Sequence, residues 1–336
     1  MKINSDELWM RHALQVARRG AGNTAENPAV GCVIVDQSGN LIATGHTAAG
    51  GRPHAETQAL IMAGEGAKGA TAYVTLEPCA HHGKTPPCAE QLVEAGLSRV
   101  VIATSDPDPR VSGKGIEILR AGGIKTITGV LAERVEFQLR GYFSRIIRGR
   151  PHVLLKLAVS SDGKIAKAPG QQTAISGPEF YPQTHLLRAR ADAILVGAGT
   201  VRTDNPTLTC RLPGMGHLSP KKIVVGGDDV LALPKRALQF PGHVDFEEVL
   251  QDLGSQGINM LLVEGGAKVA TSLLEADLVD EIILAMAPHS IGPQGVDALA
   301  GLPLTKITAN EHFVLKQQET LGPDVVRHYL RTNRTS

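Results

Sequence analysis

The sequence has few aromatic residues and almost no net charge. Six Phe, four Tyr and one Trp in 336 residues leave few side chains on which nucleic-acid bases could stack. The formal net charge is +1, and no dense run of Lys and Arg occurs, so no surface for a nucleic-acid duplex or an anionic membrane is indicated. We therefore expect neither nucleic acid nor a membrane as a partner.

Cysteines and long apolar runs are also scarce. The four cysteines are too few and too scattered for a disulfide framework. The first nineteen residues lack the apolar segment of a secretory signal, and no apolar run approaches the ~18 residues of a transmembrane helix. These absences favour a cytoplasmic protein. The cysteines are Cys32, Cys79, Cys88 and Cys210.

One imidazole, two thiols and one carboxylate stand in two short segments, 53–56 and 77–88. Zinc is usually tetrahedral, so His54, Cys79 and Cys88 would leave a fourth position for water, whose pKa falls to about 7 on the metal. Glu56, two residues after His54, could carry a proton from that water to a leaving amine. The pattern indicates hydrolytic deamination with one zinc ion per chain.

Several alternatives remain open for this pattern. Zinc nucleobase deaminases have two residues between their cysteines, whereas eight separate Cys79 from Cys88. A buried cysteine pair with a helix-capping histidine is the structural alternative, and His81 and His82 are further candidate ligands. A deaminase of nucleic-acid bases, or a non-catalytic module whose zinc has four protein ligands, would also carry such residues.

The length of 336 residues favours two domains. Strand and helix patterns alternate in both halves, which predicts mixed sheets covered by helices. We expect the linker at 145–151 and the last clear strand at 281–287. Between a strand at 260–263 and a helix at 267–274, Gly265 and Gly266 form either a phosphate-binding turn or a plain tight turn.

The first half contains a set of short motifs: Asn27-Pro28-x-Val30-Gly31, His54-Ala55-Glu56, Thr75-Leu76-Glu77-Pro78-Cys79-x-His81-x-Gly83-Lys84-Thr85-Pro86-Pro87-Cys88, Asp106-Pro107-Asp108-Pro109 and Gly113-x-Gly115. These motifs resemble those of the RibD family of bifunctional riboflavin-biosynthesis enzymes, in which the wide cysteine spacing is a family feature. The resemblance implies a cytidine-deaminase-like α/β/α sandwich at 1–146. It assigns Asn27, His46, Lys84 and Asp106 to the substrate, a phosphorylated ribosylaminopyrimidine.

Residues 150–333 resemble the reductase half of the same family, which implies a dihydrofolate-reductase-like α/β domain and NADPH as cofactor. The matching motifs are Lys156-Leu157-Ala158-x-Ser160-x-Asp162-Gly163-Lys164, Gly199-Thr200-Val201-x-x-Asp204-Asn205-Pro206-x-Leu208-Thr209-x-Arg211 and Val263-Glu264-Gly265-Gly266. The resemblance assigns to NADPH Ala158, Thr200, Asp204, Gly266, Ala267, Lys268, Val269, Ala270, Thr271 and Ser272. It assigns to the reductase substrate Lys156, Arg188, Leu208, Arg211 and Glu264.

Some positions depart from the family pattern. Gln172 and Ala174 stand in a segment where the family commonly has Ser-x-Trp-Ile-Thr, and Gly226-Gly227 replaces an Asp-Ser pair. The implied function is deamination followed by NADPH-dependent reduction in a homo-oligomer, a dimer or a tetramer. The alternative is a deaminase whose second half has lost reduction and serves as an oligomerisation scaffold.

Overall fold

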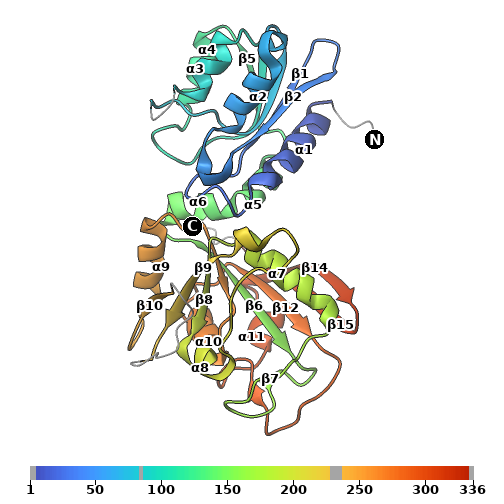
Figure 1. Ribbon diagram of the computed structural model, residues 1–336, viewed down its shortest axis with the longest axis vertical. Helices are drawn as coiled ribbons and strands as arrows, with labels where there is room; N and C mark the ends of the chain where they lie inside the picture. The colour runs from blue at the N-terminus through green and yellow to red at the C-terminus, as the bar shows by residue number, and fades with distance from the viewer. Residues whose placement is uncertain (1–4, 83–85, 228–236, 333–336) are drawn as a thin grey trace. The chain divides into compact units, whose positions relative to one another are not determined.

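The computed structural model describes residues 5–82, 86–227 and 237–332, and the chain divides into two compact units, Met1–Gly149 and Arg150–Ser336 (Figure 1). Lys84 lies outside the described residues. Each unit is a sheet with helices packed on it, so the predicted two-domain α/β class is confirmed. Within the described ranges, no helix is long and apolar enough to cross a membrane.

The first unit is built on one mixed sheet. Its strands lie in the order β2 (Leu41–His46), β1 (Gly31–Val35), β3 (Thr71–Leu76), β4 (Arg99–Thr104) and β5 (Lys125–Thr128). Strand β1 is antiparallel to both neighbours, and β3, β4 and β5 are parallel. The helices are α1 (Ser5–Ala17), α2 (Ala55–Ala63), α3 (Cys88–Glu94), α4 (Lys114–Ala121), α5 (Ala132–Gln138) and α6 (Arg140–Arg148).

Two glycines bring helices close to opposite faces of this sheet. A Cβ on Gly31 would meet the backbone of α1 at Ala13, and one on Gly45 would meet the backbone of α2 at Ala55. Gly31 pairs with His46 and Gly45 with Cys32. Because directly paired residues share a face and successive residues alternate, α1 and α2 cover different faces. The result is a helix–sheet–helix sandwich.

The second unit has a larger sheet. Its order is β10 (Leu238–Phe240), β9 (Lys221–Val225), β8 (Ala193–Gly197), β11 (Met260–Val263), β6 (His152–Val159), β12 (Glu281–Met286), β15 (Asp324–Arg331) and β14 (Phe313–Leu321). The first six strands are parallel, and β15 and β14 close the sheet with antiparallel pairings. A separate ribbon joins β7 (Lys164–Ala166) to β13 (Val296–Asp297). The helices are α7 (Tyr181–Arg190), α8 (Ala198–Asp204), α9 (Phe246–Ser255), α10 (Ala267–Glu275) and α11 (Thr305–Thr308).

Alternating side chains of β6 divide the core of this unit into two layers. Leu155 and Leu157 belong to the cluster that contains residues of α9 and α10. Leu154 belongs to the cluster that contains Phe180, next to α7. Lys156 shares the parity of Leu154, and its Nζ lies 5.3 Å from the centroid of the Phe180 ring. The sheet therefore directs one amine toward the α7 side.

The two units divide inside the segment in which we expected the linker, whereas the expected last strand is not the last. Helix α6 runs to Arg148, and the units divide after Gly149, whose φ of 70° ends the helix. Strand β12 is not the last, because β14 and β15 follow it. Most side chains of β14 are exposed, so this edge strand lacks the buried alternation by which a strand is predicted.

Candidate active sites

The three predicted metal ligands lie together in the first unit. The ligand atoms of His54, Cys79 and Cys88 are all within 4.8 Å of one another. His54 Nδ1 is 3.7 Å from the Cys79 Sγ and 3.3 Å from the Cys88 Sγ. Two sulfurs and one imidazole nitrogen that lie this close together form a donor set that fits zinc and leaves one tetrahedral position open.

Each ligand is placed at the end of an element. His54 is the N-cap of α2, Cys79 follows β3, and Cys88 is the first residue of α3. The backbone N–H of Cys88 donates to the Cys79 Sγ at 3.3 Å. Glu56 lies in the first turn of α2 and is 4% exposed. Thus the short His-x-Glu spacing puts both residues at one helix start, beside two cysteines that are distant from them in sequence.

The charges in this cluster are coupled. A hydrogen bond with Cys88 lowers the pKa of Cys79 to about 4, and the same bond raises that of Cys88. A hydrogen bond with Cys79 raises the pKa of His54. Burial raises the pKa of Glu56 to about 7. A carboxyl group with this pKa can both take and return a proton near neutral pH, as a general acid–base requires.

Two of the predicted substrate residues line the cavity beside this cluster. The cavity has a volume of about 240 Å³, and Asn27 and Asp106 are part of its wall together with His54, Glu56 and Cys79. His46 is not part of that wall, and burial lowers its pKa. Asp106 Oδ1 accepts hydrogen bonds from the Tyr142 hydroxyl at 3.0 Å and the Asp108 backbone at 2.9 Å. Burial raises the pKa of Asp106 to about 6.

Glu77 was not singled out from the sequence. Its carboxylate is 3% exposed and accepts four backbone N–H groups at 3.0–3.4 Å. It therefore fastens the loop that carries Asp106 to the strand end that carries Cys79. No local signal could predict this, because all four donors lie about thirty to forty residues further along the chain. The donors are Asp106, Gly113, Gly115 and Ile116.

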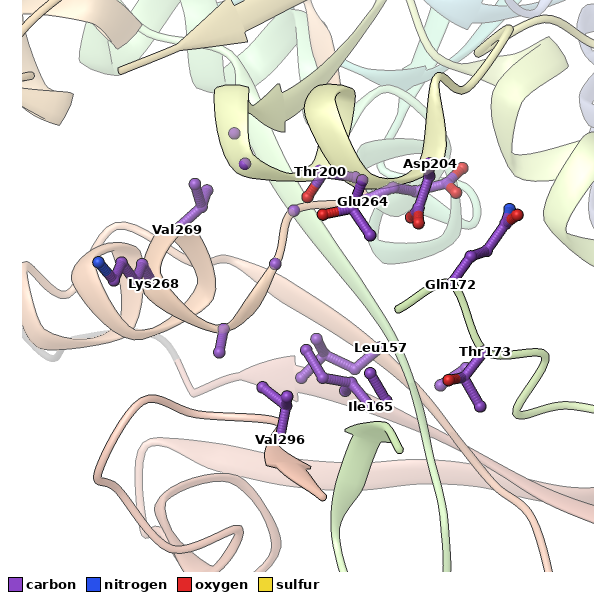
Figure 2. Close-up of a pocket in the computed structure, with 18 of the residues that line it drawn as sticks. Leu157, Ile165, Gln172, Thr173, Thr200, Asp204, Glu264, Lys268, Val269 and Val296 are labelled. Atoms are coloured by element: carbon purple, nitrogen blue, oxygen red, sulfur yellow. The ribbon is translucent and has the colours of Figure 1, made fainter. Parts of the chain in front are cut away.

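A second and larger cavity, of about 1300 Å³, lies in the second unit (Figure 2). Figure 2 shows Thr200, Asp204 and Glu264 on one side of it, Leu157 and Ile165 on the other. At its wall, Arg188 donates from Nε and Nη2 to the two carboxylate oxygens of Glu264 at 2.7 and 2.9 Å. This volume suits a dinucleotide together with a small substrate.

The charged groups of this cavity influence one another. Burial lowers the pKa of Lys156, against the opposing effect of the Glu264 charge. Burial raises the pKa of Glu264, but the hydrogen bonds from Arg188 and the charge of Lys156 outweigh it, so the pKa lies below its usual value. Burial alone raises the pKa of Asp204. Arg188 and Lys156 therefore both favour the ionised form of Glu264.

Most residues assigned to NADPH by resemblance line this cavity, but not all of them do. Gly266 is the N-cap of α10, and Ala270 and Thr271 are buried residues of that helix that do not belong to the cavity wall. Those that line it are Ala158, Thr200, Asp204, Gly266, Ala267, Lys268, Val269 and Ser272.

Only some of the predicted substrate residues of this unit line the cavity. Lys156, Arg188 and Glu264 line the cavity, whereas Leu208 and Arg211 do not. The Leu208 side chain is 2% exposed and belongs to the core. Arg211 donates from Nε to the Tyr181 hydroxyl at 2.7 Å. In this conformation, the last two residues offer the cavity no side-chain group.

The positions that depart from the family pattern all lie at this cavity. Gln172 and Ala174 belong to its wall, as do Gly226 and Gly227. Both glycines have positive φ, 74° and 76°, a conformation that most other residues avoid. The turn after β9 therefore has a backbone conformation that favours glycine at both positions.

Comparison with known proteins separates the same two halves. Residues 3–104 match the model described as the cytidine and deoxycytidylate deaminase zinc-binding region. Residues 151–327 match the model of the RibD C-terminal domain. The first match covers all three candidate ligands, and the second covers the large cavity.

Relatives match along nearly the whole chain. The riboflavin biosynthesis protein RibD of Escherichia coli K12 is 38% identical over 96% of this chain and 98% of its own, and that of Aquifex aeolicus is 36% identical over 97% and 98%. The structure of Acinetobacter baumannii RibD, form 1, superposes with a TM-score of 0.90 at 34% identity, over 98% of this chain and 99% of its own. The chain therefore belongs to the RibD family of bifunctional riboflavin-biosynthesis enzymes, which join a zinc-dependent deaminase domain to an NADPH-dependent reductase domain.

Proposed function

We propose that this chain catalyses two consecutive steps of riboflavin synthesis. The first is hydrolytic deamination of 2,5-diamino-6-(5-phosphoribosylamino)pyrimidin-4-one. The second is reduction of the ribosyl group of 5-amino-6-(5-phosphoribosylamino)uracil to ribityl. The observation that carries the proposal is the convergence of His54, Cys79 and Cys88 beside buried Glu56, in a chain that also has the RibD C-terminal domain.

In the deaminase half, His54, Cys79 and Cys88 would hold one zinc ion, which supplies an activated water. Glu56 takes a proton from the attacking water and gives it to the departing ammonia, which leaves poorly until protonated. Asn27, His46, Lys84 and Asp106 bind the substrate. Support for Asn27 and Asp106 comes from their place in the cavity wall.

In the reductase half, NADPH supplies the hydride that reduces C1 of the ring-opened ribose. The residues assigned to it by resemblance hold it, and the N–H groups at the start of α10 face its phosphates. Arg188, Glu264 and Lys156 bind the substrate from the cavity wall, with Leu208 and Arg211 beyond it. Lys156 and Asp204, whose pKa values burial moves toward the neutral forms, are the groups that exchange a proton with the sugar oxygen.

The same proposal extends to the organisation of the protein. Residues 1–146 form the deaminase domain and residues 150–333 the reductase domain, in a cytoplasmic homo-oligomer, a dimer or a tetramer. Among the described residues, no feature favours a C-terminal half that has lost reduction. The match to the RibD C-terminal domain over residues 151–327 supports an active reductase.

A coupled assay tests both halves at once. Purified protein is given the phosphorylated diaminopyrimidine and NADPH, and ammonia and NADPH are recorded together. We expect ammonia release followed by NADPH loss in equal amount. Ammonia without NADPH loss would refute the reductase half, and absence of both would refute the whole proposal.

A further inference from the structure

The deaminase cavity is too small for the whole of a phosphorylated substrate. Its volume is about 240 Å³, whereas sites that bury drug-sized ligands span about 300–1,000 Å³. A pyrimidine ring near His54 and Glu56 therefore fills the cavity and leaves its phosphoribosyl arm at the mouth. A cation among the residues that line the opening would bind a phosphate there, and the wall contains Arg52, Arg110 and Arg145.

Arg110 is a cation of the cavity wall that reaches solvent. Its side chain is 72% exposed, whereas that of its partner Asp108 is 7% exposed. Arg110 Nε lies 2.9 and 3.0 Å from the two oxygens of Asp108, and Nη2 lies 2.5 Å from Oδ2. The Arg110 backbone N–H donates to the same carboxylate at 2.9 Å. One edge of the guanidinium is thus fixed by a carboxylate two residues away.

This pairing holds the guanidinium without using all its donors. Arginine has five N–H groups, of which Asp108 occupies the one on Nε and one on Nη2. Within the described part of the chain, Nη1 makes no hydrogen bond. The remaining N–H groups point away from Asp108, in the fork geometry that phosphate accepts.

The anchor of Arg110 continues into the cavity wall. The Asp108 backbone N–H donates to Asp106 Oδ1 at 2.9 Å, and the Tyr142 hydroxyl donates to the same oxygen at 3.0 Å. Arg110 is therefore positioned relative to Asp106 before any ligand arrives, which lowers the conformational entropy lost on binding. Arg145, in the same wall, instead donates from Nη2 to the Glu26 carbonyl at 2.8 Å.

We propose that Arg110, held by Asp108, binds the phosphate monoester of the deaminase substrate. The inference rests on the proposed deamination of a phosphorylated ribosylaminopyrimidine and adds the residue that selects the phosphorylated form. Arg110 takes no part in the chemistry, so it acts on substrate affinity and not on the rate of the bound complex.

The test compares two substrates in two variants. KM and kcat for ammonia release are measured with the phosphorylated diaminopyrimidine and with its dephosphorylated riboside. Arg110→Ala should raise KM for the phosphorylated substrate by about tenfold or more, since charged hydrogen bonds are lost, and leave KM for the riboside unchanged. Arg120→Ala, an exposed arginine outside the cavity wall, is the matched control and should change neither.

Three results would overturn the inference. An unchanged KM for the phosphorylated substrate in Arg110→Ala would show that the phosphate lies elsewhere. An equal rise for both substrates would show that Arg110 acts on the ring or on the fold. Absence of ammonia release from the unsubstituted protein would refute the proposed deamination itself and the inference with it.

Discussion

Arg188 and Glu264 form a two-point ion pair in the wall of the reductase cavity, with 2.7 Å between Nε and Oε1 and 2.9 Å between Nη2 and Oε2. Both residues were expected from resemblance to meet the substrate. Arg188 also donates from Nη1 to the Thr209 carbonyl at 3.1 Å. A substrate that enters this cavity therefore meets a fixed pair of charges rather than two independent side chains.

Breaking this pair should destabilise the second unit. Arg188→Met leaves the buried Glu264 carboxylate without its ion-pair partner, and the loss of one partner of a buried ion pair costs about 3–5 kcal/mol of stability. We expect the unfolding midpoint of that unit, followed by circular dichroism, to fall by about 6 °C or more. Arg202→Met, at an exposed position of the same cavity, should shift it by no more than about 2 °C; equal shifts in the two variants would contradict the role of the pair.

Glu56→Gln should keep the metal and abolish deamination. The amide is nearly isosteric, so the ligands stay in place, but it cannot accept and return a proton. Zinc content by atomic absorption should match the unsubstituted protein, while ammonia release falls by about 10²-fold or more. Glu65→Gln, an exposed position after α2, should have no effect. A variant at position 56 with a full deamination rate would remove Glu56 from the mechanism.

Cys88→Ser should lower the zinc content. A serine hydroxyl is a poor substitute for thiolate, and His82 is held by Glu90 at 3.4 Å on the surface. The buried Cys210 lies in the other unit, so Cys210→Ser should retain the metal and serve as the control. Full zinc occupancy in the Cys88 variant would instead point to His81 or His82 as a ligand.

Asp106 should make the stability of the first unit depend on pH. Its pKa is about 6 in the folded protein and about 4 when unfolded, so between these values the folded state binds the extra proton. Stability conferred by that proton is complete below about pH 4 and is lost as the pH rises through 6. The Asp106→Asn variant can keep both hydrogen bonds to Oδ1. Because its amide does not titrate, the variant does not lose this stability as the pH rises. The thermal midpoint of the variant relative to the unsubstituted protein should rise between pH 4 and pH 7; a flat difference would contradict the prediction.

Ala174→Trp should strengthen NADPH binding. Ala174 is an exposed residue of the reductase cavity, at a position where the family commonly has Trp. An aromatic wall contributes about 0.5–1.5 kcal/mol beyond its buried area, which corresponds to about a two- to tenfold lower KM for NADPH. KM for the pyrimidine substrate is the internal control. An unchanged KM for NADPH would show that the cofactor does not reach this part of the wall.

Features that are determined by residue type and by neighbouring residues in the sequence were predicted correctly. Strand β11 lies at the predicted position, because a mostly buried apolar run bounded by turns defines it. The proximity of His54, Cys79 and Cys88 was also predicted, since the residue types themselves carry the chemistry. By contrast, the Arg188–Glu264 pair joins residues 76 positions apart. Arg188 lies on α7 and Glu264 directly follows β11, so only the packing of that helix on the sheet brings them together.

The remaining failures have physical causes of the same kind. Strand β14 is an edge strand whose side chains are mostly exposed, so its sequence has no apolar alternation. The carboxylate of Glu77 is satisfied entirely by backbone groups, and backbone donors leave no trace in residue identity.

The close approach of α2 to β2 has a consequence for the chemistry of the first unit. Gly45 carries no reactive group, yet its missing side chain allows the backbone of Ala55 to rest directly on the strand. His54 and Glu56 are the residues on either side of Ala55. The absence of a side chain at Gly45 therefore sets how close the His54 imidazole and the Glu56 carboxylate lie to the sheet. A side chain at position 45 would therefore displace both catalytic groups, although Gly45 takes no part in the chemistry.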